Sequence, residues 1–280
     1  MYYTDFEYDN QRLSDFGCIV CQILEDGSTK TVNVGSQITF NTIHNPNTNK
    51  FSRVSAQYDE AFTSTFEVCK NPCGNDNDVF TPEEVSYLTR WLNRKTYKKF
   101  KMVYEDGELS NVYYNASMNV EPITLAGRII GLQLVLITDA PFAYYDEVEY
   151  TMEFTKDNLS HSYYDISDEI GYIYPSSMII EILQDGDFEI SNSQDITEKT
   201  IITDCKAGEI IAIIENKVIT SSIRESLYNN FNFIYPKIGN DFKYMVNYGY
   251  YSDDTENIFT VNIPCNITFK YSPICKMGIV

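Results

Sequence analysis

Histidine, tryptophan and basic side chains are scarce in this sequence of 280 residues. There are two His and one Trp, and 21 Lys and Arg residues stand against 40 Asp and Glu, which gives a formal net charge of −19. So acidic a chain repels phosphate, and we expect neither nucleic-acid binding nor a cationic role at a membrane. The apolar runs are shorter than the roughly 18–20 residues that span a bilayer, so membrane insertion is not expected. The first residues, MYYTDFEYDNQRL, lack the basic start and apolar core of a secretory signal, which predicts synthesis in the cytoplasm.

The motifs of common enzymes are also absent. The sequence has no G-x-S-x-G, H-E-x-x-H, P-loop or G-x-G-x-x-G. His44 and His161 both lie in polar stretches, as solvated histidines do. Among 40 carboxylates some pair will lie at glycosidase distance by chance, so carboxylates alone do not indicate hydrolysis. We therefore expect no enzymatic activity and no cofactor.

The seven cysteines are an odd number and are expected to be mostly free thiols in a reducing compartment. Cys18 and Cys21, together with Cys69 and Cys73, could be imagined as four zinc ligands. The first pair lies in GCIVCQI, which predicts a strand, and positions i and i+3 of a strand point to opposite faces. No metal site is therefore expected.

One segment, FTPEEVSYLTRWLNRKTYKKF, strongly predicts a helix, which we place at residues 81–99. Thr81 can cap its N-terminus, Pro82 suits the first helical position, and Glu84 completes a capping box. The apolar face of this helix consists of Val85, Leu88 and Leu92.

Basic residues gather in the last turns of this predicted helix and at its exit. A solvated face, favoured by the negative end of the helix dipole, explains them as well as a docking surface for an acidic neighbour does. If they do form an assembly interface, its residues are Arg94, Lys95, Lys98 and Lys99.

The rest of the sequence is typical of β-structure. Its 23 Tyr and 16 Phe suit pleated, half-buried surfaces. Asp-Gly pairs at 26–27, 106–107 and 185–186 lie between apolar segments and predict hairpins. Residues 36–44 predict a strand followed by a polar loop at 45–50, and residues 131–138 predict a buried strand.

The strand pattern breaks at DAPFAYYD, residues 139–146, and this break predicts two domains, 1–143 and 144–280. The first contains one helix among about seven predicted strands, which favours a small barrel or a sheet packed by that helix. The second contains short strands at regular spacing, which favours a β-sandwich.

Pairs of adjacent tyrosines recur in the second half of the sequence, as at Tyr163 and Tyr164. Such residues could stack against sugar rings, or they could pack within strands and at interface rims. Both interpretations stay open, and these two residues are the candidates for contact with a glycan or a partner.

Four stretches, taken in order, resemble the distal tail protein family of siphophages, the long-tailed, non-contractile bacteriophages. The first is the N-terminal strand followed by ITFNTI, and the second is the helical segment with the hairpin at Asp106-Gly107. The third is GRIIGLQLVLITDAPFAYYDE. The fourth is the C-terminal series GEIIAIIENKVITSS, LYNNFNFIYPKI and NIFTVNIPCNITFKYSPICKMGI.

This resemblance implies a mainly β structural virion protein with an N-terminal split β-barrel, one α-helix and a C-terminal galectin-like β-sandwich. The N-terminal domain would form a ring of six copies at the phage tail tip. That ring would join the tail tube protein to the tail-tip hub and to receptor-binding or baseplate proteins that act in host attachment. The alternative is a carbohydrate-binding protein that recognises host cell-surface glycan through its C-terminal sandwich, and the two functions can coexist.

Overall fold

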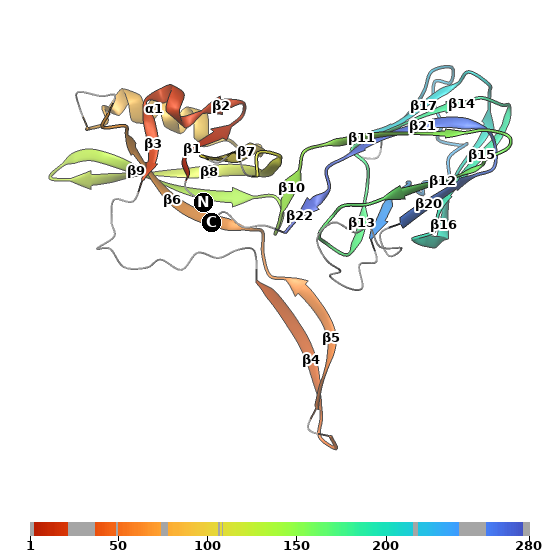
Figure 1. The fold of residues 1–280 in the computed structure, drawn as a ribbon, viewed down its shortest axis with the longest axis horizontal. Helices are drawn as coiled ribbons and strands as arrows, with labels where there is room; N and C mark the ends of the chain where they lie inside the picture. Colours follow the sequence, from red (N-terminus) through yellow and green to blue (C-terminus); the bar gives the residue numbers. More distant parts are fainter. Residues whose placement is uncertain are drawn as a thin grey trace. The chain divides into compact units, whose positions relative to one another are not determined.

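The computed structural model describes residues 3–21, 37–48, 50–73, 78–105, 107, 109–214, 218–240 and 256–276. The chain divides into two compact units, an N-terminal unit of Met1–Tyr144 with Lys276–Val280 and a C-terminal unit of Tyr145–Cys275. Strands dominate both units, and the described residues contain one α-helix, so the predicted mainly β fold with a single helix is confirmed (Figure 1). The predicted hairpin at Asp26-Gly27 lies outside the described residues.

An antiparallel sheet forms the body of the N-terminal unit, with the strand order β2-β1-β7-β8-β9-β6-β3. Because the edge strands β2 and β3 do not pair with each other, the described strands form an open sheet and not a closed barrel. The strands are β1 (Tyr3–Tyr8), β2 (Gln11–Arg12), β3 (Cys18–Cys21), β6 (Thr63–Lys70), β7 (Lys98–Tyr104), β8 (Val112–Leu125) and β9 (Arg128–Thr138), with a 3₁₀ turn, η1, at Leu13–Phe16.

The helix α1 (Pro82–Leu92) begins as the sequence predicts. The Thr81 hydroxyl accepts the Glu84 N–H at 3.2 Å, and the Glu84 carboxylate accepts the Thr81 N–H at 2.7 Å, which completes the capping box. The predicted extent to residue 99 is wrong, because Asn93 is already extended and Lys98 begins β7. From there buried and less buried side chains alternate with the period of a strand, and this alternation overrides helical propensity.

A cluster of rings joins α1 to the sheet. We call Phe6, Tyr8, Phe66, Trp91 and Phe100 the N-terminal aromatic cluster, and all five are buried. The Phe6 ring lies 5.9 Å from that of Trp91, 5.6 Å from Phe66 and 5.4 Å from Phe100, measured between centroids. The Trp91 indole N–H donates to the Tyr8 carbonyl at 3.1 Å, so the single Trp is both packed and hydrogen-bonded.

Two further strands of the N-terminal unit, β4 (Ile38–Asn45) and β5 (Lys50–Tyr58), form a separate antiparallel hairpin, which we call the arm. Figure 1 shows the arm, in orange, extending away from the sheet. Every residue of β4 is exposed, and so is every residue of β5 before Tyr58. The Tyr58 ring lies 6.4 Å from that of Phe142, which anchors the base of the arm to its own unit.

The C-terminal unit is a two-layered sandwich. One sheet has the order β11-β21-β14-β17-β18 and the other β12-β20-β15-β16, and a single buried cluster contains apolar side chains from both. The predicted β-sandwich is thus confirmed. The strands of the two sandwich sheets are β11 (Val148–Phe154), β12 (Ser160–Tyr164), β14 (Ser177–Ile182), β15 (Gly186–Asn192), β16 (Asp195–Cys205), β17 (Ile210–Ile214), β18 (Val218–Ser221), β20 (Glu256–Val261) and β21 (Cys265–Tyr271). Outside them, β13 (Gly171–Ile173) pairs with β19 (Ile238–Asn240), and β10 (Ala143–Tyr145) pairs with β22 (Ile274–Cys275).

The hairpin predicted at Asp185-Gly186 is wrong, because β14 and β15 belong to different sheets. The connection crosses from one layer of the sandwich to the other, and Gly186 adopts a φ of +147° there. The Asp185 carboxylate accepts the Ala207 N–H at 2.8 Å, which fixes the crossing. Asp-Gly predicts a reversal of the chain, but it does not distinguish a hairpin from a connection between sheets.

Candidate interaction surfaces and polar clusters

The structure separates the four basic residues predicted as an assembly interface. Arg94 and Lys95 follow α1, and Lys98 and Lys99 belong to β7. The Arg94 Nε–H donates to the Trp91 carbonyl at 3.0 Å, and the Lys98 ammonium lies 3.5 Å from the Asp9 carboxylate. The Lys99 ammonium lies 4.2 Å from the centroid of the Tyr113 ring, and Lys95 is exposed. Three of these cations therefore contact groups of their own unit, and an interface role for the four stays a prediction.

Tyr163 and Tyr164 are adjacent on β12 and therefore point to opposite faces of its sheet. Tyr163 is buried, and its hydroxyl lies 2.7 Å from that of Tyr271. Tyr164 is exposed, and its hydroxyl donates to Glu256 at 3.2 Å. The two rings therefore do not lie on one stacking surface, and contact of either residue with a glycan or a partner stays a prediction.

The seven cysteines are free thiols. Burial raises the pKa of the Cys18 thiol to about 11 and that of Cys265 to about 12, so both stay protonated near neutral pH. Within the described ranges, no three or more His, Cys, Asp and Glu side chains gather as metal ligands. The described helix is also too short and too polar to span a membrane.

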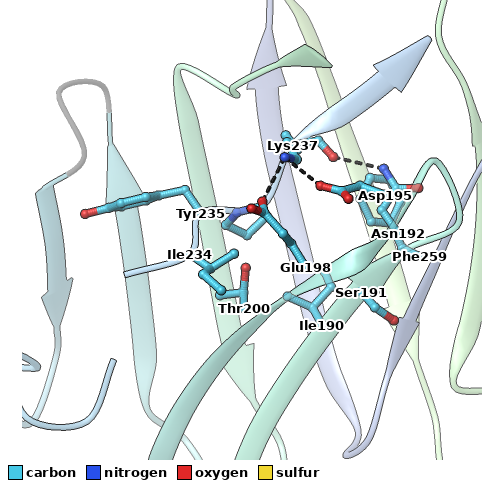
Figure 2. A pocket seen from close by; sticks show the side chains of 11 residues that line it. Ile190, Ser191, Asn192, Asp195, Glu198, Thr200, Ile234, Tyr235, Lys237 and Phe259 are labelled. Carbon is cyan, nitrogen blue, oxygen red and sulfur yellow. Dashed lines mark hydrogen bonds and ion pairs between the residues drawn. The ribbon is translucent and has the colours of Figure 1, made fainter. Parts of the chain in front are cut away.

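Lys237 occupies a polar cluster at the edge of the sandwich, which Figure 2 shows. Its ammonium lies 2.5 Å from the Asp195 carboxylate, 2.8 Å from that of Glu198 and 4.4 Å from the centroid of the Tyr172 ring. Hydrogen bonds to these carboxylates raise the pKa of Lys237, and the hydrogen bond from Lys237 lowers the pKa of Asp195 against the opposing effect of burial. The adjoining cavity measures about 20 Å³, enough for about one water molecule. The charged groups of this cluster therefore contact one another and not a bound ligand.

We expect Lys237→Met to lower the free energy of unfolding by about 1–3 kcal/mol, because it leaves the largely buried Asp195 carboxylate without its cation. Equilibrium denaturation measures this effect. The matched control is Lys206→Met, which breaks the exposed pair with Asp185 and should cost at most about 1 kcal/mol. Equal losses for the two variants would contradict the assignment.

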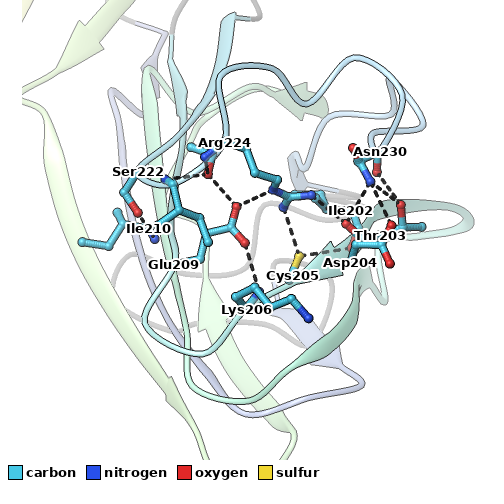
Figure 3. A network of polar contacts seen from close by, with 12 residues as sticks. Ile202, Thr203, Asp204, Cys205, Lys206, Glu209, Ile210, Ser222, Arg224 and Asn230 are labelled. Atoms are coloured by element: carbon cyan, nitrogen blue, oxygen red, sulfur yellow. Dashed lines mark hydrogen bonds and ion pairs between the residues drawn. The ribbon is translucent and has the colours of Figure 1, made fainter.

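A second polar cluster, drawn in Figure 3, is centred on the fully buried Glu209. Arg224 Nε donates to the Glu209 carboxylate at 2.7 Å, Ser221 Oγ donates at 2.6 Å and the Lys206 N–H at 3.0 Å. Arg224 also donates to the Thr203 carbonyl at 2.9 Å. Burial opposes the charge of Glu209, but the hydrogen bonds outweigh it and lower the pKa of this carboxyl.

This cluster connects the two layers of the sandwich. Thr203 lies on β16 of one sheet, and Ser221 lies on β18 of the other, with Arg224 bridging them. Figure 3 shows the donors and acceptors of the cluster facing one another and forming hydrogen bonds and ion pairs. The arrangement is that of an internal ion pair, Arg224 with Glu209, which holds the two sheets together.

The arm is an exposed apolar surface that the sequence did not reveal. Phe40, Ile43, Phe51 and Val54 are large apolar side chains with more than half of their surface exposed. The segment KFSRVSAQY, which forms β5, contains residues that suit a strand. Its apolar and polar residues do not alternate regularly, because neither face of β5 is buried, so the sequence pattern did not predict this strand. Exposed apolar surface of this kind marks sites of protein–protein contact.

Comparison with known proteins gives this architecture a family. Residues 1–140 match the family model described as phage tail protein N-terminal domain, and residues 142–271 match that of the phage tail C-terminal domain. Among solved structures, the chain is similar to the Dit protein (gp 19.1) of SPP1, described as a paradigm of the hub adsorption apparatus in phages that infect Gram-positive bacteria. The TM-score is 0.63 at 12% identity, over 97% of this chain and 99% of that chain, which shows a shared fold.

No curated protein sequence matches the chain. The two domain models nevertheless cover nearly all of it, and the resemblance to siphophage distal tail proteins is thereby confirmed. A structural role in a phage tail follows from this membership. The chain belongs to the phage tail protein family that these N-terminal and C-terminal domains define.

Proposed function

We propose that this protein is the distal tail adaptor of a siphophage virion. Its N-terminal unit assembles into a ring, and that ring joins the tail tube to the tail-tip hub and to receptor-binding or baseplate proteins. The observation that supports this proposal is the match along both units: the phage tail models cover residues 1–140 and 142–271, and one hub protein shares the fold over 97% of the chain.

The proposed ring contains six copies, located at the tail tip after synthesis in the host cytoplasm. The role is structural and needs no catalysis. In support, the two polar clusters of the C-terminal unit consist of internal ion pairs, Lys237 with Asp195 and Arg224 with Glu209. Side chains held in this way stabilise a rigid adaptor and are poorly placed for turnover.

The native mass of the purified full-length protein, with negative-stain images of the same sample, tests this proposal. We expect a six-fold ring with a mass near six times 32.3 kDa. Antibodies against the protein should also label one point on virions, the distal end of the tail. Labelling along the tube or on the capsid would contradict the adaptor role, whatever the mass of the purified protein.

A further inference from the structure

Two cysteine thiols lie next to each other at one edge of the N-terminal sheet. β3 pairs antiparallel with β6, and the register sets Cys21 opposite Glu67 and Ile19 opposite Cys69. Cys21 and Cys69 are therefore diagonal neighbours on one face of the sheet, because residues two apart on a strand share a face. Burial and a hydrogen bond with the Cys69 side chain raise the pKa of the Cys21 thiol, so the two thiols are in contact. We call these two residues the thiol pair.

The thiol pair is open to reagents in solution. Both side chains are half-buried, whereas Cys18, which points to the other face of β3, is buried. Both thiols are free, so the structure describes the reduced form of the pair. A small molecule can reach the two sulfur atoms, and neither is engaged in another covalent bond.

The end of β3 can bring the two sulfur atoms to bonding distance. Diagonal neighbours in a sheet have Cα atoms about 7–8 Å apart, and a disulfide accepts Cα separations up to about 6.8 Å. Cys21 is the last residue of β3, and among the described strands β3 pairs with β6 alone. Since no second strand holds it on its other side, Cys21 can move inward by the roughly 1 Å that the bond requires.

We propose that the thiol pair is an oxidation site, at which a low-molecular-mass disulfide (RSSR) creates an intramolecular disulfide between Cys21 and Cys69. One protein thiol loses its proton, and its sulfur bonds to one sulfur of the reagent while the other leaves and takes up a proton as RSH. The second protein thiol then attacks this mixed disulfide, so that the Cys21–Cys69 bond forms and a second RSH leaves. The protein loses two electrons, and RSSR gains the same two.

The new bond ties the edge strand β3 to β6 and closes the segment between them, which contains both strands of the arm. A disulfide of this kind stabilises a fold mainly by restricting the unfolded chain, and more so when the closed segment is long. The setting of the reaction rests on the proposed function. A virion protein is made in a reducing cytoplasm, where thiols stay reduced, and the released virion enters an oxidising medium.

Mass spectrometry on the full chain carrying Cys73→Ser tests the proposal, since this substitution removes the exposed thiol. The folded protein is incubated with bis(2-hydroxyethyl) disulfide, an uncharged reagent that the acidic chain does not repel, and is then unfolded and alkylated with N-ethylmaleimide. Before oxidation we expect six alkylated thiols, the seven cysteines less Cys73, and two fewer afterwards. Peptide mapping should place the new bond between Cys21 and Cys69.

The oxidised protein should also unfold at a temperature at least about 4 °C higher than the reduced protein, and dithiothreitol should reverse this shift. Cys21→Ser and Cys69→Ser, made in the same background, each keep one member of the pair and should show no rise. Cys18→Ala is the control on the other face and should oxidise like the parent. Retention of all six thiols by the folded protein, or a bond from Cys21 or Cys69 to another cysteine, would overturn the proposal.

The outcomes separate this inference from the proposed function, because the oxidation is measured without a ring. A protein that forms tail-tip rings but gives no Cys21–Cys69 bond would leave the adaptor standing and remove the oxidation site. A protein that forms the bond, but whose antibodies do not label the tail tip, would leave the oxidation site standing and remove the adaptor.

Discussion

Glu209→Gln should lower the free energy of unfolding of the C-terminal unit by about 3–5 kcal/mol. The substitution keeps the size of the side chain and removes its charge, which leaves the Arg224 guanidinium largely buried without a counter-ion. Breaking one partner of a buried ion pair costs far more than the pair contributes, because the remaining charge stays desolvated. Urea denaturation followed by circular dichroism measures the loss.

The matched control is Glu189→Gln, whose partner Lys199 lies 3.6 Å away with side chains 40% and 56% exposed. This exposed pair should cost at most about 1 kcal/mol. The double variant Glu209→Gln, Arg224→Met should recover part of the loss, since it removes both buried charges together. If Glu209→Gln and Glu189→Gln lowered the free energy of unfolding by similar amounts, the cluster would not be holding the two sheets together.

The effect of Glu209→Gln should depend on pH. Because hydrogen bonds hold the pKa of Glu209 below the unfolded value of about 4.3, its carboxylate stabilises the fold fully above that value. The contribution is lost as the pH falls through the folded-state pKa. The difference in stability between wild type and variant should therefore narrow on acidification below about pH 4, and a constant difference would contradict this assignment.

Trp91→Ala should destabilise the N-terminal unit by about 3–5 kcal/mol. It removes the largest ring of the N-terminal aromatic cluster, and it leaves the Tyr8 carbonyl without its donor. A cavity between α1 and the sheet would follow, because the rings around it are held by other contacts. Calorimetry is the suitable measurement, because the substitution removes the single Trp of the chain and with it the Trp fluorescence that could otherwise report unfolding.

Tyr97→Ala provides the control, because this aromatic residue is exposed and its loss should stay within about 0.5 kcal/mol. Trp91→Phe should lie between the two, since it keeps a ring in the cluster and loses the hydrogen bond to Tyr8. A cost below about 1 kcal/mol for Trp91→Ala would mean that α1 is held to the sheet by other contacts.

The start of α1 could be predicted because its determinants are local: Thr81, Pro82 and Glu84 act within one turn. Its end could not, because the basic residues after Leu92 are good helix formers and are drawn into β7 by pairing with β8. A long-range contact decides that boundary.

The same contrast between local determinants and long-range pairing explains where the other predicted elements differ from the structure. The reversal at Asp185 was predictable, but the sheet that β15 joins depends on its pairing with β20 and β16. The strand at residues 36–44 was predictable, but its partner β5 was not. Strand alternation alone could have shown that Tyr163 and Tyr164 lie on opposite faces. The arm, by contrast, projects from the sheet with both strands exposed, so burial left no signal in the sequence.

The position of β21 between β11 and β14 sets the order in which the two units can fold during synthesis. The strands of the path β2-β1-β7-β8-β9-β6-β3 all precede residue 139, so this part of the sheet can form while the ribosome is still making the rest. In the C-terminal unit, β11 and β14 emerge early but do not pair with each other. One edge of β14 can pair with β17, while its other edge and β11 await β21. We expect the N-terminal unit to fold first, and the nascent sandwich to keep unpaired strand edges until residue 271 has emerged.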